Sequence, residues 1–342
     1  MIVAMRQDAT PEQIQRVMDR ICEAGLRPER MPGGERTAVG IVSAIPAPLR
    51  ASLTSQLESL PGVDHVTQVS RAYKLASREF HPADTVVQVG EVAIAGPAVV
   101  LMAGPCAVES WEQMREAAQA VRAAGGRVLR GGAYKPRTSP YAFQGLEEEG
   151  LRILQAVGRE VGLATVTEVV DPHEVELVAR YADILQLGAR NMQNYPLLVA
   201  AGKSGRPVLL KRGMSASIDE WLLAAEYVMS AGESRVLLCE RGVHPLDRTY
   251  TRNTLDLSCL PVLKEITHLP VIVDPSHATG NARLVPAMCR AAVAAGADGL
   301  LVEVHPRPHQ ALCDGQQSLP TESLAGLVAE LRRVAEAVGR SL

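Results

Sequence analysis

Six cationic residues lie at or just after short apolar runs, a position that suits anion binding. They are Arg130, Lys135, Arg137, Arg190, Lys211 and Arg241. If the apolar runs are parallel strands of a barrel, their carboxyl ends lie together, and so do the six charges. Like charges in a partly dry cleft repel one another unless an anion neutralises them, and Arg forks match carboxylates and phosphates. The pattern predicts a small ligand with more than one phosphate or carboxylate group.

Four potential metal ligands occupy the same kind of position. Cys106 follows the first apolar run, His277 follows the seventh, Glu303 ends the eighth, and Asp314 lies in the loop beyond. The first and eighth strands are neighbours in a closed barrel, so the four side chains can converge there. A thiolate, an imidazole and two carboxylates suit a divalent transition ion (Mn, Fe, Co or Zn) better than Ca or Mg. Cys313 is an alternative thiol ligand.

Several other classes of protein are disfavoured by what the sequence lacks. It has no Gly-x-Ser-x-Gly elbow, Walker loop or His-Glu-x-x-His motif, which leaves those hydrolase and nucleotide-binding readings without support. Its 35 Lys+Arg and 38 Asp+Glu give a formal charge of −3, which disfavours nucleic acid as a partner.

The cellular location is expected to be the cytoplasm. The longest uncharged run, residues 92–108, is interrupted by two Gly-Pro pairs and is too short for a membrane span of about 20 residues. Residues 1–10 show no secretory signal, and the six cysteines form no CxxC pair. We therefore expect a soluble protein with reduced thiols and no membrane partner.

The apolar runs that must position these residues alternate with amphipathic helical patterns. We expect strands at 99–103, 127–130, 164–167, 183–186, 208–211, 236–239, 271–274 and 299–303. Helical patterns between them include 111–124, 146–161, 172–181, 218–231 and 282–295. This alternation over about 250 residues favours a (β/α)8 barrel over an open sheet. His305 is expected in the turn after the last strand, and no Gly-x-Gly-x-x-Gly supports a dinucleotide fold.

Residues 1–70 have a different pattern. We expect a strand at 2–5, a helix from Thr10-Pro11 to Gly25, strands at 26–31 and 36–44, a helix at 48–60 and a strand at 63–69. The order β-α-β-β-α-β is that of a ferredoxin-like domain. Residues 71–96 are expected to form a linker with a hairpin that turns at Gly90, and residues 97–342 to form the barrel.

The polar segments after the strands resemble those of the DAHP (3-deoxy-D-arabino-heptulosonate 7-phosphate) synthase family, in the same order and spacing. They are Gly104-Pro-Cys-Ala-Val-Glu-Ser110, Lys135-Pro-Arg-Thr-Ser-Pro140, Gly188-Ala-Arg-Asn191, Leu210-Lys-Arg-Gly213, Cys239-Glu-Arg-Gly242 and Asp274-Pro-Ser-His-Ala-Thr-Gly280. The chain is similar to the short microbial subgroup with a ferredoxin-like domain ahead of the barrel. One departure is Val243-His-Pro-Leu-Asp247, where the family more often has a basic and aromatic stretch.

The resemblance implies a metal-dependent transferase of the shikimate pathway to chorismate and the aromatic amino acids. It would condense phosphoenolpyruvate with erythrose 4-phosphate. The implied metal ligands are Cys106, His277, Glu303 and Asp314. The implied phosphoenolpyruvate-binding residues are Arg130, Lys135, Arg190, Lys211 and Arg241, and those for erythrose 4-phosphate are Arg137 and Thr138. The implied catalytic residues are Lys135, Cys106 and His277.

The resemblance also implies a homotetramer and a Tyr or Phe effector for the first domain. The alternative role for this domain is assembly or stabilisation of the protein. Protons could be moved by Lys135, or by a water that Asp314 or His277 orients, and the residues do not rank these. One alternative function is 3-deoxy-D-manno-octulosonate 8-phosphate synthase, which uses arabinose 5-phosphate. Lys135-Pro-Arg-Thr138 argues against it, because that relative resembles Lys-Ala-Asn-Arg-Ser there. A second alternative is a non-catalytic allosteric binding protein.

Overall fold

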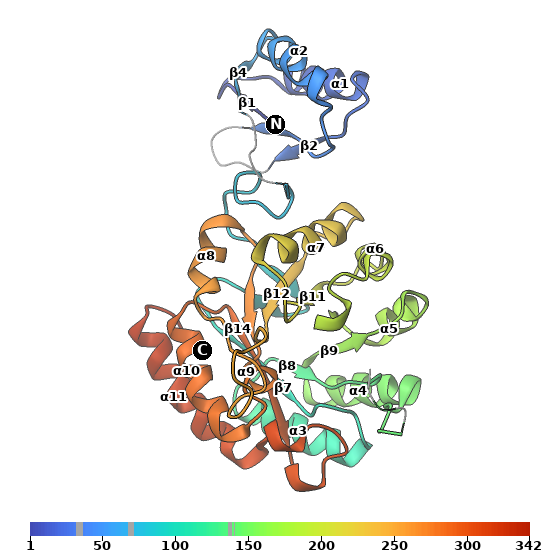
Figure 1. Cartoon of the computed structure of the whole chain (residues 1–342), viewed down its shortest axis with the longest axis vertical. Coiled ribbons are helices and arrows are strands. Elements are labelled where there is room, and N and C mark those ends of the chain that lie inside the picture. Colours follow the sequence, from blue (N-terminus) through green and yellow to red (C-terminus); the bar gives the residue numbers. More distant parts are fainter. Residues whose placement is uncertain (32–36, 68–71, 136–138, 140) are drawn as a thin grey trace. The chain divides into compact units, whose positions relative to one another are not determined.

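The structure is a computed structural model, and it describes residues 1–31, 37–67, 72–135, 139 and 141–342 (Figure 1). The chain divides into two compact units. The first consists of residues 1–83 with 265–268, and the second of residues 84–264 with 269–342. Each unit has its own apolar core.

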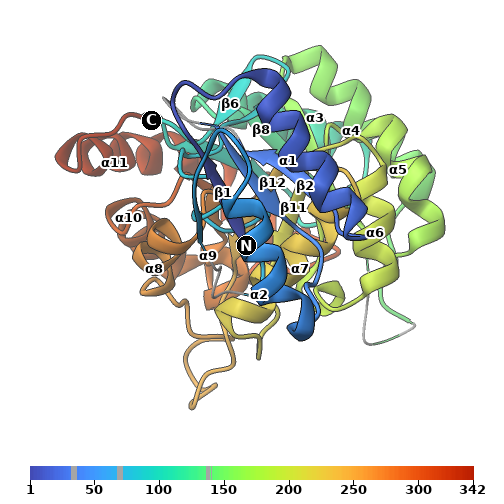
Figure 2. The same ribbon diagram turned by 90° about the horizontal axis from the view of Figure 1, so that it is seen from above.

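The first unit is a four-stranded antiparallel sheet with two helices on one face (Figure 2). Its elements are β1 (Ile2–Met5), α1 (Pro11–Glu23), β2 (Pro28–Met31), β3 (Ala38–Ile41), α2 (Ala47–Glu58) and β4 (Val63–Thr67). The strand order β2-β3-β1-β4 confirms the predicted ferredoxin-like fold. Helix α1 starts at the predicted capping box, in which Thr10 and Gln13 bond each other's backbone, and its buried residues include Val17 and Ile21.

Eight parallel strands form a closed barrel in the second unit, as predicted. They are β7 (Val100–Gly104), β8 (Val128–Arg130), β9 (Ala164–Val169), β10 (Ile184–Leu187), β11 (Val208–Lys211), β12 (Val236–Glu240), β13 (Val271–Val273) and β14 (Gly299–His305). Each strand pairs with the next in this order, and β14 pairs with β7 to close the ring. The short strand β15 (Leu319–Pro320) extends the sheet beside β14.

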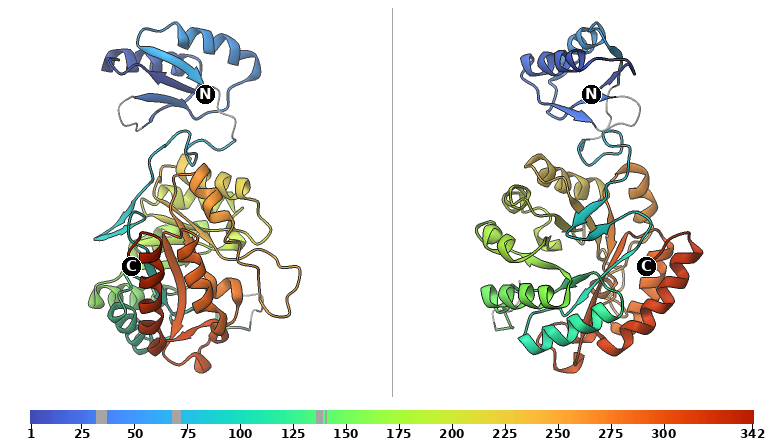
Figure 3. Two further views of the ribbon diagram at one scale, coloured as in Figure 1. Left: turned by 90° about the vertical axis from the view of Figure 1, so that its left-hand side faces the viewer. Right: turned by 180° about the vertical axis from the view of Figure 1, so that it is seen from behind.

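Helices form the outer layer of the barrel (Figure 3). They are α3 (Trp111–Ala123), α4 (Glu147–Val161), α5 (Val175–Tyr181), α6 (Tyr195–Lys203), α7 (Ile218–Ser230), α8 (Cys259–Ile266), α10 (Val285–Ala294) and α11 (Leu324–Ala337). The short helix α9 (Pro275–Thr279) instead follows β13 at the carboxyl end of the barrel and carries His277. Their buried faces carry mainly small and aliphatic side chains. Among the described residues, no helix is long and apolar enough to cross a membrane.

A hairpin precedes the first barrel strand and packs into the barrel interior. Its strands are β5 (Val87–Val89) and β6 (Val92–Ile94). Its apolar side chains share one core cluster with residues near the beginnings of the barrel strands, including Val100, Val128 and Ile184. The hairpin thus fills the amino-terminal end of the barrel and leaves the carboxyl-terminal end for polar residues.

Two of the strand ends that differ from the predicted bounds have a clear structural reason. Strand β13 ends at Val273, because Asp274 is the N-cap of α9 and accepts a hydrogen bond from the His277 backbone N–H. Strand β14 continues to His305, which was expected in a turn, because Val304 and His305 pair with β15. The His305 ring is buried, with Nε2 3.4 Å from Glu109 Oε2.

Candidate active site

The end of β7 lies tightly against the end of β8. Gly104 has φ +153°, and a Cβ there would lie 2.0 Å from the Arg130 carbonyl oxygen, so this position requires glycine. This approach places Cys106, two residues after the strand, above the barrel interior. It also brings Arg130, the last residue of β8, under the same loop, where its guanidinium donates to the Pro105 carbonyl at 2.6 Å.

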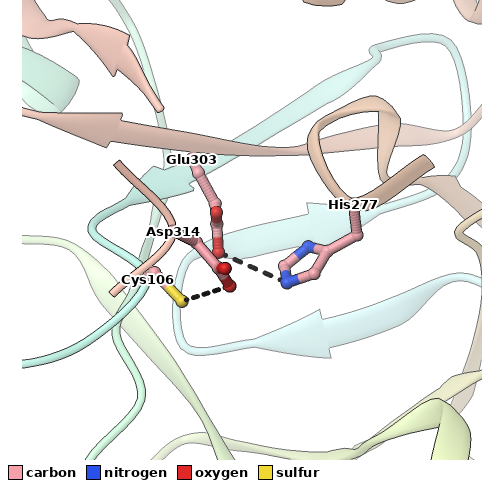
Figure 4. A group of neighbouring side chains, drawn as sticks. All are labelled: Cys106, His277, Glu303 and Asp314. Atoms are coloured by element: carbon pink, nitrogen blue, oxygen red, sulfur yellow. Dashed lines mark hydrogen bonds and ion pairs between the residues drawn. The ribbon is translucent and has the colours of Figure 1, made fainter. Parts of the chain in front are cut away.

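The four predicted metal ligands converge at this end of the barrel. One ligand atom from each of Cys106, His277, Glu303 and Asp314 lies within 4.8 Å of all the others. Figure 4 shows the four side chains pointing toward one another. Cys106 Sγ lies 3.3 Å from Asp314 Oδ2, and His277 Nε2 lies 3.4 Å from Glu303 Oε1. A thiol, an imidazole and two carboxylates at these separations fit a divalent transition ion.

Charges around the cluster keep its carboxyl groups ionised. Burial alone would raise the pKa of Glu303, but the positive charges of His277 and then Arg130 hold it below its ordinary value. Burial opposes the shift at Asp314 as well, yet the positive charges of His277 and then Arg252 lower its pKa to about 2. Burial lowers the pKa of His277, which favours the neutral ring that a metal ligand needs.

Two residues outside the predicted set orient these ligands. Asp274 Oδ2 lies 2.7 Å from His277 Nδ1, the ring nitrogen that does not face Glu303. Gln317 is fully buried and donates from Nε2 to Glu303 Oε2 at 2.6 Å. Partners of this kind fix the orientation and basicity of metal ligands. Asp274 could have been found from its N-cap position before Pro275, whereas Gln317 carries no local sequence signal.

The predicted cations line a cavity beside the metal ligands. Its volume is about 520 Å³, and Lys135, Arg190, Lys211 and Arg241 all line it, together with His277 and Asp314. Arg130 lies behind this wall, buried and paired with Glu303 at 2.9 Å. Arg137 and Thr138 lie outside the described residues, so the predicted erythrose 4-phosphate contacts are not placed.

Three of these cations, Lys211, Lys135 and Arg241, have different surroundings. Lys211 Nζ lies 2.5 Å from Asp274 Oδ2, so one buried carboxylate contacts both this lysine and the metal-ligand candidate His277. Lys135 Nζ donates to Cys106 Sγ at 3.0 Å. Burial would lower the pKa of Lys135, but the negative charge of Cys106 in its thiolate form outweighs burial and raises this pKa. Burial lowers the pKa of Arg241.

Further residues line the cavity that were not predicted as site residues. They are Ser139, Ala142, Glu168, Gln186, Gly188, Ala189, Met214, His244, Arg248, Arg252 and Asn253. Glu168 belongs to β9, and its Oε2 accepts a hydrogen bond from Gln186 Nε2 at 3.3 Å. The position of Glu168 near a strand end was a usable signal. By contrast, Arg252 and Asn253 come from a long loop, and loop residues far from strand ends cannot be placed from a strand pattern.

Cys313, the alternative thiol, is adjacent to the metal-ligand candidates. Its Sγ lies 3.2 Å from Cys106 Sγ, and both residues are buried. The hydrogen bond with Cys313 and then burial raise the pKa of the Cys106 thiol well above its usual value. Cys106 is therefore a neutral thiol at physiological pH when no metal is bound. Its conversion to a thiolate ligand requires loss of a proton.

Comparison with known families identifies both units. The DAHP synthetase I family matches residues 84–338, and the DAHP synthase ferredoxin-like domain matches residues 1–71. The chain belongs to the DAHP synthetase I family. This membership covers the whole barrel, with every described residue of the candidate site, and the second match covers the small sheet.

Relatives of this DAHP synthetase I chain include a phospho-2-dehydro-3-deoxyheptonate aldolase of Thermotoga maritima, 46% identical over 99% of both chains. A crystal structure of that Thermotoga aldolase, also called DAHP synthase, matches with a TM-score of 0.78 and 45% identity over 99% of this chain and 98% of that one. A 2-dehydro-3-deoxyphosphooctonate aldolase of Syntrophotalea carbinolica is 35% identical over 69% of this chain and 90% of its own length.

Proposed function

We propose that the protein is a 3-deoxy-7-phosphoheptulonate synthase. It condenses phosphoenolpyruvate with erythrose 4-phosphate and water, and it releases DAHP and inorganic phosphate. The observation that carries this assignment is the convergence of four metal-ligand candidates with Lys135, Arg190, Lys211 and Arg241 at one mouth of a barrel of this family. Such a mouth can hold two anionic substrates beside a Lewis acid.

The metal would be held by the thiolate of Cys106, the imidazole of His277 and the carboxylates of Glu303 and Asp314. The mixture of soft and hard donors supports Mn, Fe, Co or Zn as the physiological ion. When bound, such an ion polarises the aldehyde oxygen and stabilises the negative charge that develops there.

The cationic residues would bring the two substrates together. Phosphoenolpyruvate is assigned to Arg190, Lys211 and Arg241 in the cavity, with Lys135 beside the metal ligands and Arg130 behind. Erythrose 4-phosphate is assigned to Arg137 and Thr138. Holding two mutually repelling anions at bonding distance contributes a large share of the rate, because it removes the entropy cost of their encounter.

The structures of the two substrates define which bonds form and break in the proposed reaction. The methylene carbon of phosphoenolpyruvate bonds to the aldehyde carbon, and water adds at the carbon that bears the phosphate ester. The bond between that carbon and the ester oxygen then breaks, and inorganic phosphate leaves. When Cys106 is a thiolate, the pKa of Lys135 is raised, so Lys135 is then an ammonium that can donate a proton to the aldehyde-derived oxygen. His277 and Cys106 act as ligands rather than as proton carriers in this scheme.

The first test is a two-substrate assay on the metal-loaded chain. Phosphate release is expected only when phosphoenolpyruvate and erythrose 4-phosphate are both present, and a chelator is expected to abolish it. Arabinose 5-phosphate is expected to be the poorer acceptor, since the octulosonate relative matches a smaller part of the chain at lower identity. Preference for arabinose 5-phosphate would contradict the assignment, and ligand binding without turnover would favour a non-catalytic role.

Metal affinity is expected to rise with pH. The pKa of the Cys106 thiol is raised in the metal-free chain, so binding as a thiolate releases one proton near neutral pH. One released proton corresponds to an affinity gain of about tenfold per pH unit, because one unit equals about 1.36 kcal/mol. Titration of Mn²⁺ at several pH values, with proton release measured calorimetrically, tests this. An affinity that is flat between pH 6.5 and 8 would contradict a thiol ligand.

The proposed domain roles and assembly follow the family resemblance, and the proposed location follows the sequence pattern. Residues 1–70 are assigned as a regulatory domain, 71–96 as its linker and hairpin, and 97–342 as the catalytic barrel of a homotetramer in the cytoplasm. The described part of the first unit has an apolar core and no group of possible metal ligands like that of the barrel, which supports a regulatory rather than a chemical role.

Feedback by an aromatic amino acid is expected on this basis. Tyr or Phe is expected to lower the rate of the full chain by about fivefold or more, in the usual range of allosteric coupling. A chain that lacks residues 1–70 is expected to lose the response. Rates with and without each amino acid give the measurement, and light scattering gives the assembly. An equal response in the shortened chain would assign the effector to the barrel.

A further inference from the structure

One loop segment of the cavity wall is bonded directly to the turn that carries the metal-ligand candidate His277. The Arg252 backbone N–H donates to the Thr279 carbonyl at 3.0 Å, and that of Asn253 donates to the Ala278 carbonyl at 2.8 Å. The Asn253 side chain donates from Nδ2 to the His277 carbonyl at 3.1 Å. The position of Arg252 is therefore fixed relative to α9.

Gly280 makes room for this arginine. It has φ +66°, and a Cβ there would lie 2.9 Å from Arg252 Cβ and 3.3 Å from its Nε. A side chain at residue 280 would be strained and would also press on the Arg252 side chain. The Arg252 side chain therefore has a defined position beside the α9 turn.

The Arg252 guanidinium extends from this position toward the metal-ligand candidates. Its Nη2 lies 3.6 Å from Asp314 Oδ1, while Asp314 Oδ2 faces Cys106 Sγ at 3.3 Å. Figure 4 shows the Asp314 carboxylate directed at Cys106. Asp314 can therefore ligate through Oδ2 while Oδ1 remains beside Arg252. The 3.6 Å separation exceeds a hydrogen bond, and the guanidinium donates none to the described residues.

A second guanidinium faces the same part of the cavity. Both Arg241 and Arg252 line it. Burial lowers the pKa of Arg241, and the positive charge of Arg252 adds to this shift, although Asp274 opposes it. The repulsion between two guanidiniums in a partly buried cavity is reduced by an anion that both can bind. The planar arrangement of their N–H donors suits a phosphate.

We propose that Arg252 is a further substrate-binding residue, which joins Arg241 on the phosphate of phosphoenolpyruvate while its other edge stays beside Asp314. This inference rests on the proposed function. Arg252 would then link the anion-binding cavity to the metal centre, since one guanidinium has enough N–H donors to contact both. It is assigned to phosphoenolpyruvate because of its proximity to Arg241.

Binding of phosphoenolpyruvate to the metal-loaded chain, without the aldose, gives a readout independent of turnover. Arg252→Ala is expected to weaken the calorimetric Kd for phosphoenolpyruvate by about 10–100-fold, as expected for loss of a charge-assisted hydrogen bond. The KM for erythrose 4-phosphate is expected to change little. Arg252→Lys should recover part of the affinity, because lysine keeps the charge but lacks the fork.

The matched control is Arg248→Ala, which removes another arginine of the same cavity. Arg248 is exposed, and its Nη2 lies 3.0 Å from His244 Nδ1. An Arg252→Ala chain that binds phosphoenolpyruvate like the wild type overturns the proposal, and so does an effect that appears only in the KM for erythrose 4-phosphate. Equal weakening by both alanine variants also overturns it, since a general loss of charge would suffice. A wild-type chain that fails to condense the two substrates refutes the proposed function instead.

Discussion

Replacement of Cys106 by alanine is expected to lower kcat for the condensation by at least about 10³-fold. The thiolate is the soft donor of the ligand set, and a bound metal supplies several kcal/mol of transition-state stabilisation, each 1.36 kcal/mol of which is a factor of ten. Steady-state rates and bound metal should be measured on the same preparation. The variant is expected to have lost both activity and stoichiometric metal.

Cys289→Ala is the control for this experiment. Cys289 is also a fully buried cysteine, but it lies in α10 outside the ligand cluster, so activity and metal content should be retained. Urea unfolding of both variants separates loss of function from loss of fold. A Cys106→Ala chain that keeps its metal and its rate would show that Cys106 is not a ligand, and Cys313→Ala would then become the next test.

The second large effect is expected at Asp274. Replacement by asparagine removes the charge that contacts both His277 Nδ1 and Lys211 Nζ. Metal affinity is expected to fall by about 10–100-fold, as is typical for the partner of a histidine ligand. Stability is expected to fall by about 3–5 kcal/mol, because Lys211 is left buried without its carboxylate. Metal titration and urea unfolding measure the two effects separately.

Asp298→Asn is the control that separates the loss of metal affinity from the loss of stability. Asp298 is likewise buried, and it pairs with Lys264 and Arg340 away from the metal ligands. This variant is expected to lose stability but to bind the metal like the wild type. If both variants lost metal affinity to the same degree, the role of Asp274 would be one of general stability rather than of ligand orientation.

The barrel could be predicted from the sequence because each strand is a short apolar run between helices. Strand β11 has the predicted bounds of Val208–Lys211, and the others agree within two residues at each end. The cations were placed for the same reason, since residues such as Lys211 directly end a strand. Closure of the barrel then brings Cys106 near Glu303, through the pairing of β14 with β7.

Contacts made by long loops could not be predicted in this way. The position of Arg252 depends on backbone hydrogen bonds from this loop to residues 278 and 279, which no periodic sequence pattern encodes. His305 was misplaced for a related reason, because its strand partner β15 is only two residues long and lies beyond a loop. The same loop carries Asp314 at φ +52°, a conformation that Asp adopts more readily than most residues.

The order of the metal-ligand candidates along the chain has a consequence for biosynthesis. Cys106 follows β7, whereas His277, Glu303 and Asp314 all belong to the last two strands and the segments after them. Until residue 277 is translated, a nascent chain holds one member of the set, and the full set exists only after residue 314 has left the ribosome. The complete ion site can therefore form only late in synthesis, after all eight barrel strands have been translated.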